Sequence, residues 1–337
     1  MDDIFSGKTT LVTGASGLLG GAVVKALLEE GRQVRAMTRS LSRAQSLARQ
    51  GAEVVQADMT NPASLERAVT GCEVVLHFAG VLPGDLGDAV YFHQVNVEGT
   101  VHLAKAALAA GVALFLHTSS AWVYGFDAGL GITERSPYLI SEDAYIDTKI
   151  ESERRLQKLR ARHNLPLVII QPSEVYGPGD GHWTLIPLRL IQTRKMILVN
   201  GGSGVIQPIY VDDVVAGALA AARRGRIGEA YLLCGSEVMT LKRFYGEFAR
   251  MLGRKWIPSV PAWLATMLVA VMESWSSLTH RPPLFSRSTL RSNIMQASYD
   301  GDKAGQELGF IPRISLQAGM SEVSAWLAAE NPLGMND

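Results

Sequence analysis

The chain has 337 residues, with 32 Lys and Arg against 32 Asp and Glu, so its net charge is zero and its pI is near 7.1. This balance argues against a broad nucleic-acid surface and leaves open only a local basic patch. Hydrophobic residues make up 47% and charged residues 19%, which is typical of a compact globular protein.

Strands and helices alternate through the first half of the sequence. Short apolar runs that predict strands are each followed by a segment with helical periodicity. The expected strands are 10–16, 33–39, 52–58, 73–80, 113–120 and 165–177, and the expected helices are 18–31, 42–51, 61–71, 93–111 and the segment around 144–153. Such alternation indicates an α/β fold with a doubly wound parallel sheet.

The order changes after Gly177. The segments 208–225 and 229–235 read as a return to the sheet, and short helices joined by proline-containing loops follow from about 237. We therefore predict a dinucleotide-binding Rossmann domain at 1–177, completed by 206–235. A smaller, mostly helical substrate domain would comprise 178–205 and 236–337.

One apolar stretch, WIPSVPAWLATMLVAVMESW (256–275), needs comparison with a membrane span. Its uninterrupted apolar part is shorter than a bilayer span. We expect a helix over 262–272 that packs in the core or lines a groove, with weak contact with a membrane surface as the alternative.

Cys72 and Cys234 lie within apolar runs, which favours buried free thiols in a reducing compartment. The N-terminal MDDIFSGKTT does not resemble a secretory signal, so we expect a cytoplasmic protein. The histidines show no ligand-like spacing, and we assign no metal.

A glycine-rich turn, TGASGLLG, follows the first predicted strand and opens the first helix. Gly14 would permit the tight turn, Gly17 would let the backbone approach a pyrophosphate, and Gly20 would allow close packing of helix on strand. The positive end of the helix dipole would favour the phosphates. Ala79 and Gly80, after the fourth strand, are small enough for a dinucleotide to lie against them.

The second strand ends in VRAMTRS, which holds arginines and no acid. An acid would bind the adenine-ribose hydroxyls, whereas an arginine fits a 2′-phosphate. We choose Arg39 over Arg35 and Arg43, with Thr38 and Ser40 as added donors. The sequence thus predicts NADP(H), with NAD(H) left open. Asp58, after the third strand, is placed either to accept from the adenine amino group or to cap the next helix.

Tyr145 and Lys149 are four residues apart in AYIDTKIESE and would share one face of a helix. A phenol has a pKa of about 10, and a neighbouring ammonium would lower that pKa toward the working pH. The pair is therefore a candidate acid–base device. The alternative is a solvated helix face.

These motifs together resemble the extended branch of the short-chain dehydrogenase/reductase superfamily, the NAD-dependent epimerase/dehydratases. The similarity covers most of the chain and rests on TGASGLLG, NVEGT (96–100), SSAWVYG, YIDTK and VYGPGD (175–180). It implies that Tyr145 is the general acid/base, that Lys149 is its partner and bonds the nicotinamide ribose, and that Ser120 anchors the substrate oxygen. Our predicted cofactor site also contains Ser16, Leu18, Met59 and Pro172.

Within the superfamily, the second half resembles 3β-hydroxysteroid dehydrogenase-like and dihydroflavonol-reductase-like members through RPPLFSR, ASYDGDKAGQELGF and ISLQAGMSEVSAWL. The resemblance implies an oxidoreductase interconverting a ketone and a secondary alcohol on a steroid-, flavonoid- or β-keto-acid-like substrate. Helix 262–272 with Trp183, Trp256 and Trp263 would suit an apolar pocket.

Three other functions fit the sequence less well. SSAWV lacks the Asp–Glu pair of the 4,6-dehydratases, which disfavours that chemistry. GVIQPIYVDD lacks the arginine that many nucleotide-sugar epimerases carry, so an epimerase is the second choice. A non-catalytic dinucleotide sensor comes last, because both Tyr145 and Lys149 are present. The family further implies a homodimer formed through helices at about 94–110 and 142–162.

Overall fold

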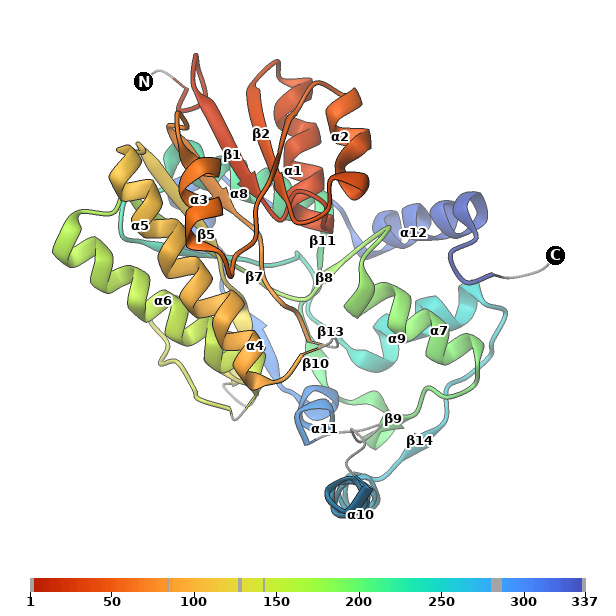
Figure 1. Cartoon of the computed structure of the whole chain (residues 1–337). Coiled ribbons are helices and arrows are strands. Elements are labelled where there is room, and N and C mark those ends of the chain that lie inside the picture. Colours follow the sequence, from red (N-terminus) through yellow and green to blue (C-terminus); the bar gives the residue numbers. More distant parts are fainter. Residues whose placement is uncertain are drawn as a thin grey trace.

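A computed structural model of the chain describes residues 3–83, 85, 87–126, 129–141, 143–279 and 287–334. Seven parallel strands form its central sheet, in the order β12-β7-β5-β4-β1-β2-β3 (Figure 1). They are β1 (Thr9–Thr13), β2 (Gln33–Thr38), β3 (Glu53–Gln56), β4 (Val74–His77), β5 (Leu114–Thr118), β7 (Leu167–Pro172) and β12 (Ala230–Leu233). The predicted doubly wound sheet is confirmed.

Helices cover both faces of this sheet. On one face α3, α5 and α6 pack side by side, and on the other α1 packs against α8 and α2 (Figure 1). Their bounds are α1 (Leu18–Glu29), α2 (Gln45–Arg49), α3 (Pro62–Val69), α5 (Thr100–Ala110), α6 (Ala144–His163) and α8 (Val211–Arg224). Strand side chains alternate between the two layers, so that Leu11 packs in one core and Val12 in the other.

The order of the strands reverses between β1 and β4. From β1 the chain proceeds to β2 and β3 on one side, and from β4 to β5 and β7 on the other. Ligands in such sheets bind beyond the carboxyl ends of the strands at this switch point. The turn after β1, with Gly14, and the segment after β4, with Ala79 and Gly80, both lie there.

The helix expected at 93–111 is longer than the sequence indicated. It begins as α4 (Ala89–His93), widens into a π-helical turn, η2 (Gln94–Gly99), and continues as α5. Gly99 in this turn packs so closely on Met59 that a Cβ atom would lie 2.7 Å from the Met59 carbonyl oxygen. The turn also holds Asn96, whose side chain bonds both the N–H and the C=O of Val81.

The remaining elements are further helical segments and two-stranded pairs. Helical segments are η1 (Leu41–Ala44), η3 (Ala121–Tyr124), η4 (Gly181–Leu185), α7 (Ile186–Gln192), η5 (Asn200–Gly202), α9 (Leu241–Met251), α10 (Ala262–Thr279), α11 (Arg287–Ile294), η6 (Ala304–Leu308) and α12 (Leu316–Glu330). Two-stranded pairs are β6 (Gly129–Ile132) with β15 (Ala297–Tyr299), β8 (Val175–Tyr176) with β11 (Ile209–Tyr210), β9 (Leu198–Val199) with β14 (Ser259–Val260), and β10 (Val205–Ile206) with β13 (Met239–Thr240).

The apolar helix α10 differs from the expectation of a core-packing or groove-lining element. Ala265 and Val269 are buried, but Trp263, Met267 and Val271 on its other side are more exposed than buried. The helix lies at an extremity of the molecule, far from α1 and α2 (Figure 1). Within the described residues, no helix is long and apolar enough to cross a membrane.

Candidate active site

The glycine turn between β1 and α1 brings three backbone segments into close contact. Gly14 has a φ of +67°, and a Cβ atom on it would lie 2.8 Å from the Ala79 nitrogen. A Cβ on Gly20 would lie 2.3 Å from the Gly14 carbonyl oxygen, so α1 could not approach the turn with any larger residue there. Gly17 precedes the first turn of α1 in an extended conformation.

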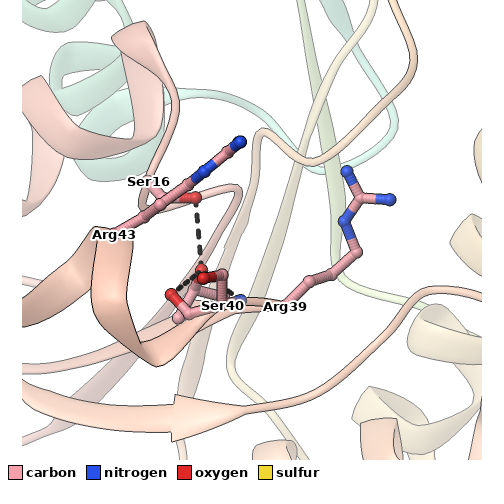
Figure 2. Close-up of a pocket in the computed structure, with 5 residues that line it drawn as sticks. Ser16, Arg39, Ser40 and Arg43 are labelled. Atoms are coloured by element: carbon pink, nitrogen blue, oxygen red, sulfur yellow. Dashed lines mark hydrogen bonds between the residues drawn. The ribbon is translucent and has the colours of Figure 1, made fainter. Parts of the chain in front are cut away.

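A pocket of about 360 Å³ opens beside this turn, lined by Ser16, Thr38, Arg39, Ser40 and Arg43. Figure 2 shows the Arg39 and Arg43 side chains on either side of Ser40. The Thr38 hydroxyl donates to Ser16 Oγ at 3.2 Å, which ties the end of β2 to the glycine turn. Two guanidinium groups and three hydroxyls therefore converge on one concave surface.

The three arginines of this region have different surroundings. Arg35 turns away from the pocket, pairing with Glu53 at 2.9 Å and donating to the Thr70 carbonyl oxygen at 2.6 Å. Arg39 lines the pocket and donates to the Tyr91 hydroxyl at 2.8 Å. The structure thus places the predicted Arg39 in the pocket and adds Arg43 to it.

The remaining predicted cofactor residues lie around the same edge of the sheet. Asp58 Oδ1 accepts from both the backbone N–H and the hydroxyl of Thr60. It does not cap α3, because Asn61 is the cap residue and accepts from the Ser64 N–H. Met59 is buried beneath η2. Leu18 opens α1 and lies near Gly179, and Pro172 is the buried last residue of β7.

Ser120, Tyr145 and Lys149 come together beyond the ends of β4 and β5. Asp143 caps the start of α6 by accepting from the Tyr145 and Ile146 N–H groups, so the first turn of the helix is held in place. Tyr145 is hydrogen-bonded to Ser120, which precedes η3. The Lys149 ammonium lies over the Tyr145 ring, 5.8 Å from its centroid. All three side chains are less than 9% exposed.

Lys149 Nζ donates to the Thr118 carbonyl oxygen at 2.9 Å and lies 3.6 Å from the position that a Cβ on Gly80 would occupy. A side chain at residue 80 would therefore fill the space beside the ammonium. The backbone at Gly80 and Ala79, the end of β5 and the Tyr145–Lys149 face of α6 thus surround one cradle. This cradle and the arginine pocket flank the glycine turn, an arrangement that fits an extended dinucleotide.

Burial controls the ionisation of this pair. It raises the pKa of Tyr145 to about 12, although the hydrogen bond to Ser120 acts in the opposite direction. It also lowers the pKa of Lys149 to about 8, against the attraction of Glu153. The expected lowering of the Tyr145 pKa is not found, because the ammonium lies over the ring face and desolvation outweighs the Ser120 bond.

An aromatic wall adjoins the Tyr145 ring. Trp122 packs edge-on against Tyr145, with ring centroids 6.4 Å apart, and also against His182, Trp183 and Phe126. Trp183 in turn stacks on Tyr245 of α9. Of the tryptophans expected in an apolar pocket, only Trp183 joins this wall, since Trp256 and Trp263 are 73% and 65% exposed.

Two buried carboxylates near the site were not identified from the sequence. Glu174 Oε1 accepts from Trp122 Nε1 at 3.0 Å and Oε2 accepts from the Gln207 N–H at 3.1 Å, so this residue fixes the indole that touches Tyr145. Glu153, one turn after Lys149, bonds Gln171 and the Tyr138 hydroxyl. Glu174 is an acid inside the apolar run 165–177 that predicts a strand, which is the one signal that could have singled it out.

His77 and His117 lie side by side under the site, with ring centroids 5.4 Å apart. His77 bonds the Thr13 and Thr100 hydroxyls, and His117 bonds Ser152. Burial, assisted by the Lys149 charge, lowers the pKa of His77 to about 3 and the pKa of His117 as well. Among the described residues, no group of His, Cys, Asp or Glu could hold a metal ion.

Comparison with known proteins agrees with this fold. Residues 10–234 match the model of the NAD-dependent epimerase/dehydratase family. A ketoreductase of Stigmatella aurantiaca that acts on 4-hydroxy-2-methyl-3-oxo-4-farnesyl-3,4-dihydroquinoline-1-oxide is 28% identical, covering 92% of this chain and 94% of its own length. A putative dihydroflavonol 4-reductase of Synechocystis is 30% identical, covering 94% of this chain and 93% of its own. The crystal structure of gox2253 superposes with a TM-score of 0.81 at 29% identity, over 97% of this chain and 99% of that one.

The chain therefore belongs to the NAD-dependent epimerase/dehydratase family, the extended branch of the short-chain dehydrogenases/reductases. It is an NAD(P)-dependent oxidoreductase of that family.

Proposed function

We propose that the protein is an NADP(H)-preferring ketoreductase that interconverts a ketone and a secondary alcohol on a hydrophobic substrate of the steroid, flavonoid or β-keto-acid type. The observation that carries the proposal is the Ser120–Tyr145–Lys149 cluster at the carboxyl edge of the sheet, facing an aromatic wall. The two reductases described above, which align over nearly the whole chain, support it.

In this proposal the arginine pocket and the glycine turn hold the adenosine end of the dinucleotide, and Lys149 and Gly80 hold its nicotinamide end. The bound nicotinamide supplies the hydride for reduction, or accepts it in oxidation. Ser120 donates a hydrogen bond to the substrate oxygen and positions it beside Tyr145 Oη. Tyr145, protonated at neutral pH because its pKa is raised to about 12, gives its proton to that oxygen as negative charge develops.

Lys149 serves the same step through its charge. The ammonium, held by the Thr118 carbonyl, stabilises the phenolate that remains after proton transfer. Trp122 and Trp183 exclude water from this side of the cradle and offer apolar surface to the substrate. The wall's tryptophans, fixed by Glu174 and by stacking on Tyr245, favour a flat, apolar substrate over a sugar nucleotide.

Replacement of Tyr145 tests the chemistry. We expect Tyr145→Phe to lower kcat for ketone reduction roughly 10²- to 10⁴-fold, the usual contribution of a positioned acid. Coenzyme affinity and melting temperature should change little. Tyr231→Phe, on β12 and far from the cluster, is the matched control and should retain kcat.

Unchanged turnover in Tyr145→Phe would refute the proposal. If a panel of ketones with NADPH gave no loss of nicotinamide absorbance but a nucleotide sugar were interconverted, the protein would be an epimerase. Binding of the dinucleotide without either reaction would point to a sensor.

The preference for NADP(H) rests on the pocket lined by Arg39 and Arg43. Two guanidinium groups can hold a 2′-phosphate through charge-assisted hydrogen bonds. We expect the double substitution Arg39→Ala/Arg43→Ala to weaken NADPH binding about tenfold to a hundredfold while NADH binding stays nearly constant. Arg49→Ala, exposed on α2 outside the pocket, is the control. Equal loss for both coenzymes would contradict the preference.

We further propose a division into a dinucleotide-binding domain, 1–177 with 206–235, and a substrate domain, 178–205 with 236–337. The pairing of β12 with β7 supports the return of the chain to the first domain.

A homodimer through the α5 and α6 face is also proposed, supported by the way these helices pack side by side at one edge of the molecule. A monomer by light scattering would refute it.

A further inference from the structure

The outer side of α10 carries large apolar side chains in contact with solvent. Trp263 is 65% exposed, Met267 57%, Leu268 47% and Val271 64%, although buried Ala265 and Val269 hold the opposite side of the helix against the protein. Residues 263, 267 and 271 are spaced four apart and therefore form one stripe. We call Trp256, Trp263, Met267, Leu268 and Val271 the α10 surface.

This surface lacks the polar side chains that normally cover the outer face of a helix in water. No charged residue occurs between 262 and 272. Trp256, which is 73% exposed, precedes β14, and β14 leads directly into α10. Ile197, 42% exposed, precedes β9, the partner of β14. The apolar exposure thus extends from the helix to the small β9–β14 pair at the same end of the molecule (Figure 1).

The sequence on either side of the apolar stripe is mainly basic. From 254 to 291 the sequence holds five basic residues (Arg254, Lys255, Arg281, Arg287 and Arg291) and one acid, Glu273, a net charge of +4 in a chain that is neutral as a whole. Arg254 and Arg291 donate to the carbonyl oxygens of Gln192 and Ser141, contacts that leave their positive charge intact. Basic residues therefore flank the apolar stripe on both sides in sequence.

We propose that the α10 surface docks on an anionic lipid bilayer, with α10 lying in the plane of the interface. An apolar stripe inserted at the boundary of the acyl chains, combined with flanking lysine and arginine, supplies the two kinds of attraction that such binding requires. Tryptophan is suited to this boundary because its ring is apolar and its N–H is polar. Since no described helix is long and apolar enough to span a membrane, the contact is interfacial.

Charge also argues against a second copy of the chain as the occupant. Two α10 surfaces brought face to face would oppose two segments of net charge +4, whereas anionic headgroups neutralise that charge. The inference depends on surface chemistry alone and stands whether or not the proposed reaction is correct.

Vesicle flotation of the full chain tests the proposal. We expect it to bind vesicles of phosphatidylcholine with phosphatidylglycerol, to bind pure phosphatidylcholine much more weakly, and to dissociate as salt is added. The double substitution Met267→Asp/Val271→Asp should lower binding about tenfold or more, because it removes apolar area and adds negative charge. Both positions are exposed, so the fold should tolerate the change; melting temperature and NADPH affinity check this.

Ile311→Asp is the matched control, since Ile311 is equally apolar and 71% exposed but precedes α12, away from α10. It should bind vesicles like the unsubstituted protein. Equal binding of the double variant and the unsubstituted protein overturns the proposal. So does a dimer that the double variant splits in light scattering without any vesicle binding, which would assign the surface to a second copy.

Discussion

Helices α1 and α10 are both rich in apolar residues, yet they occupy opposite environments. In α1 the buried residues Val23, Val24 and Leu27 face the sheet and α8, and Lys25 and Glu29 face water. In the part of α10 whose side chains are described, 262–272, Ala265 and Val269 are the buried residues, and Trp263 and Met267 face solvent. Composition alone does not distinguish the two. The placement of charged residues distinguishes the two helices. Helix α1 has an exposed face with Lys25 and Glu29, whereas residues 262–272 of α10 include no charged residue.

This difference shows what amphipathic periodicity determines. A helix with one polar face can pack in one rotation only, so its neighbours follow from its pattern. A helix that is apolar all round has no preferred rotation from sequence, and its partner must come from the rest of the molecule or from outside it. For α10 the protein supplies little cover, which is why we infer a lipid surface.

The largest contrast is expected from matched truncations in these two helices. Leu27→Ala should lower the free energy of unfolding by about 2–5 kcal/mol, since Leu27 is fully buried and a cavity would remain. Met267→Ala should change it by less than about 0.5 kcal/mol, as usual for exposed positions. Urea denaturation measures both. A comparable loss in Met267→Ala would show that the outer face of α10 is covered in solution, and the comparison would fail.

Two glycines in helices, Gly20 and Gly246, allow a similar comparison of how tightly the backbone is packed. Gly20→Ala places a Cβ 2.3 Å from the Gly14 carbonyl oxygen, so α1 must shift away from the turn. We expect a loss of about 1–3 kcal/mol in stability, typical of overpacking, and weaker coenzyme binding.

Gly246→Ala in α9 is the control, because its Cβ would meet nothing within 4 Å. It should stabilise the protein by up to about 1 kcal/mol through helix propensity. Thermal unfolding and NADPH titration distinguish the two. A Gly20→Ala protein with unchanged coenzyme affinity would mean that the close packing of turn and helix does not shape the site.

The half of the fold built from strand–helix units was predictable because its signals are local. Each strand of the sheet is a short apolar run, and the polar residues that follow it meet at one edge. The proximity of Tyr145 and Lys149 likewise follows from four-residue spacing on one helix. Even the return of 229–235 to the sheet, as β12 beside β7, was visible as an apolar run.

What the sequence could not provide depends on distant contacts. Glu174 supports Trp122 from 52 positions away, and β15 pairs with β6 across about half the chain. Arg35 and Arg39 look equivalent in VRAMTRS, yet one bonds Glu53 and the other lines the pocket. The pKa of Tyr145 depends on burial, which neighbouring residues in sequence do not reveal.

A further expected effect is on pH dependence, and it concerns the buried Lys149. Because its pKa is lowered to about 8, the ammonium is lost above that pH, and kcat/KM for ketone reduction should then fall about tenfold per pH unit. Tyr145 stays protonated across this range, so it does not limit reduction. In the oxidation direction the phenolate is the base, and the rate should rise with pH until Lys149 loses its charge.

The loss of activity at high pH can be distinguished from unfolding, because stability and activity should change with pH in opposite directions. The pKa of Lys149 is lower in the folded chain than the ordinary value of 10.5, so between about pH 8 and 10.5 the unfolded chain binds more protons at this residue. The contribution of Lys149 to stability therefore rises with pH in that window, while activity falls. Melting temperatures recorded alongside the rate profile test the assignment, and a reduction rate that stays flat to pH 10 would show that the Lys149 charge has no part in the reaction.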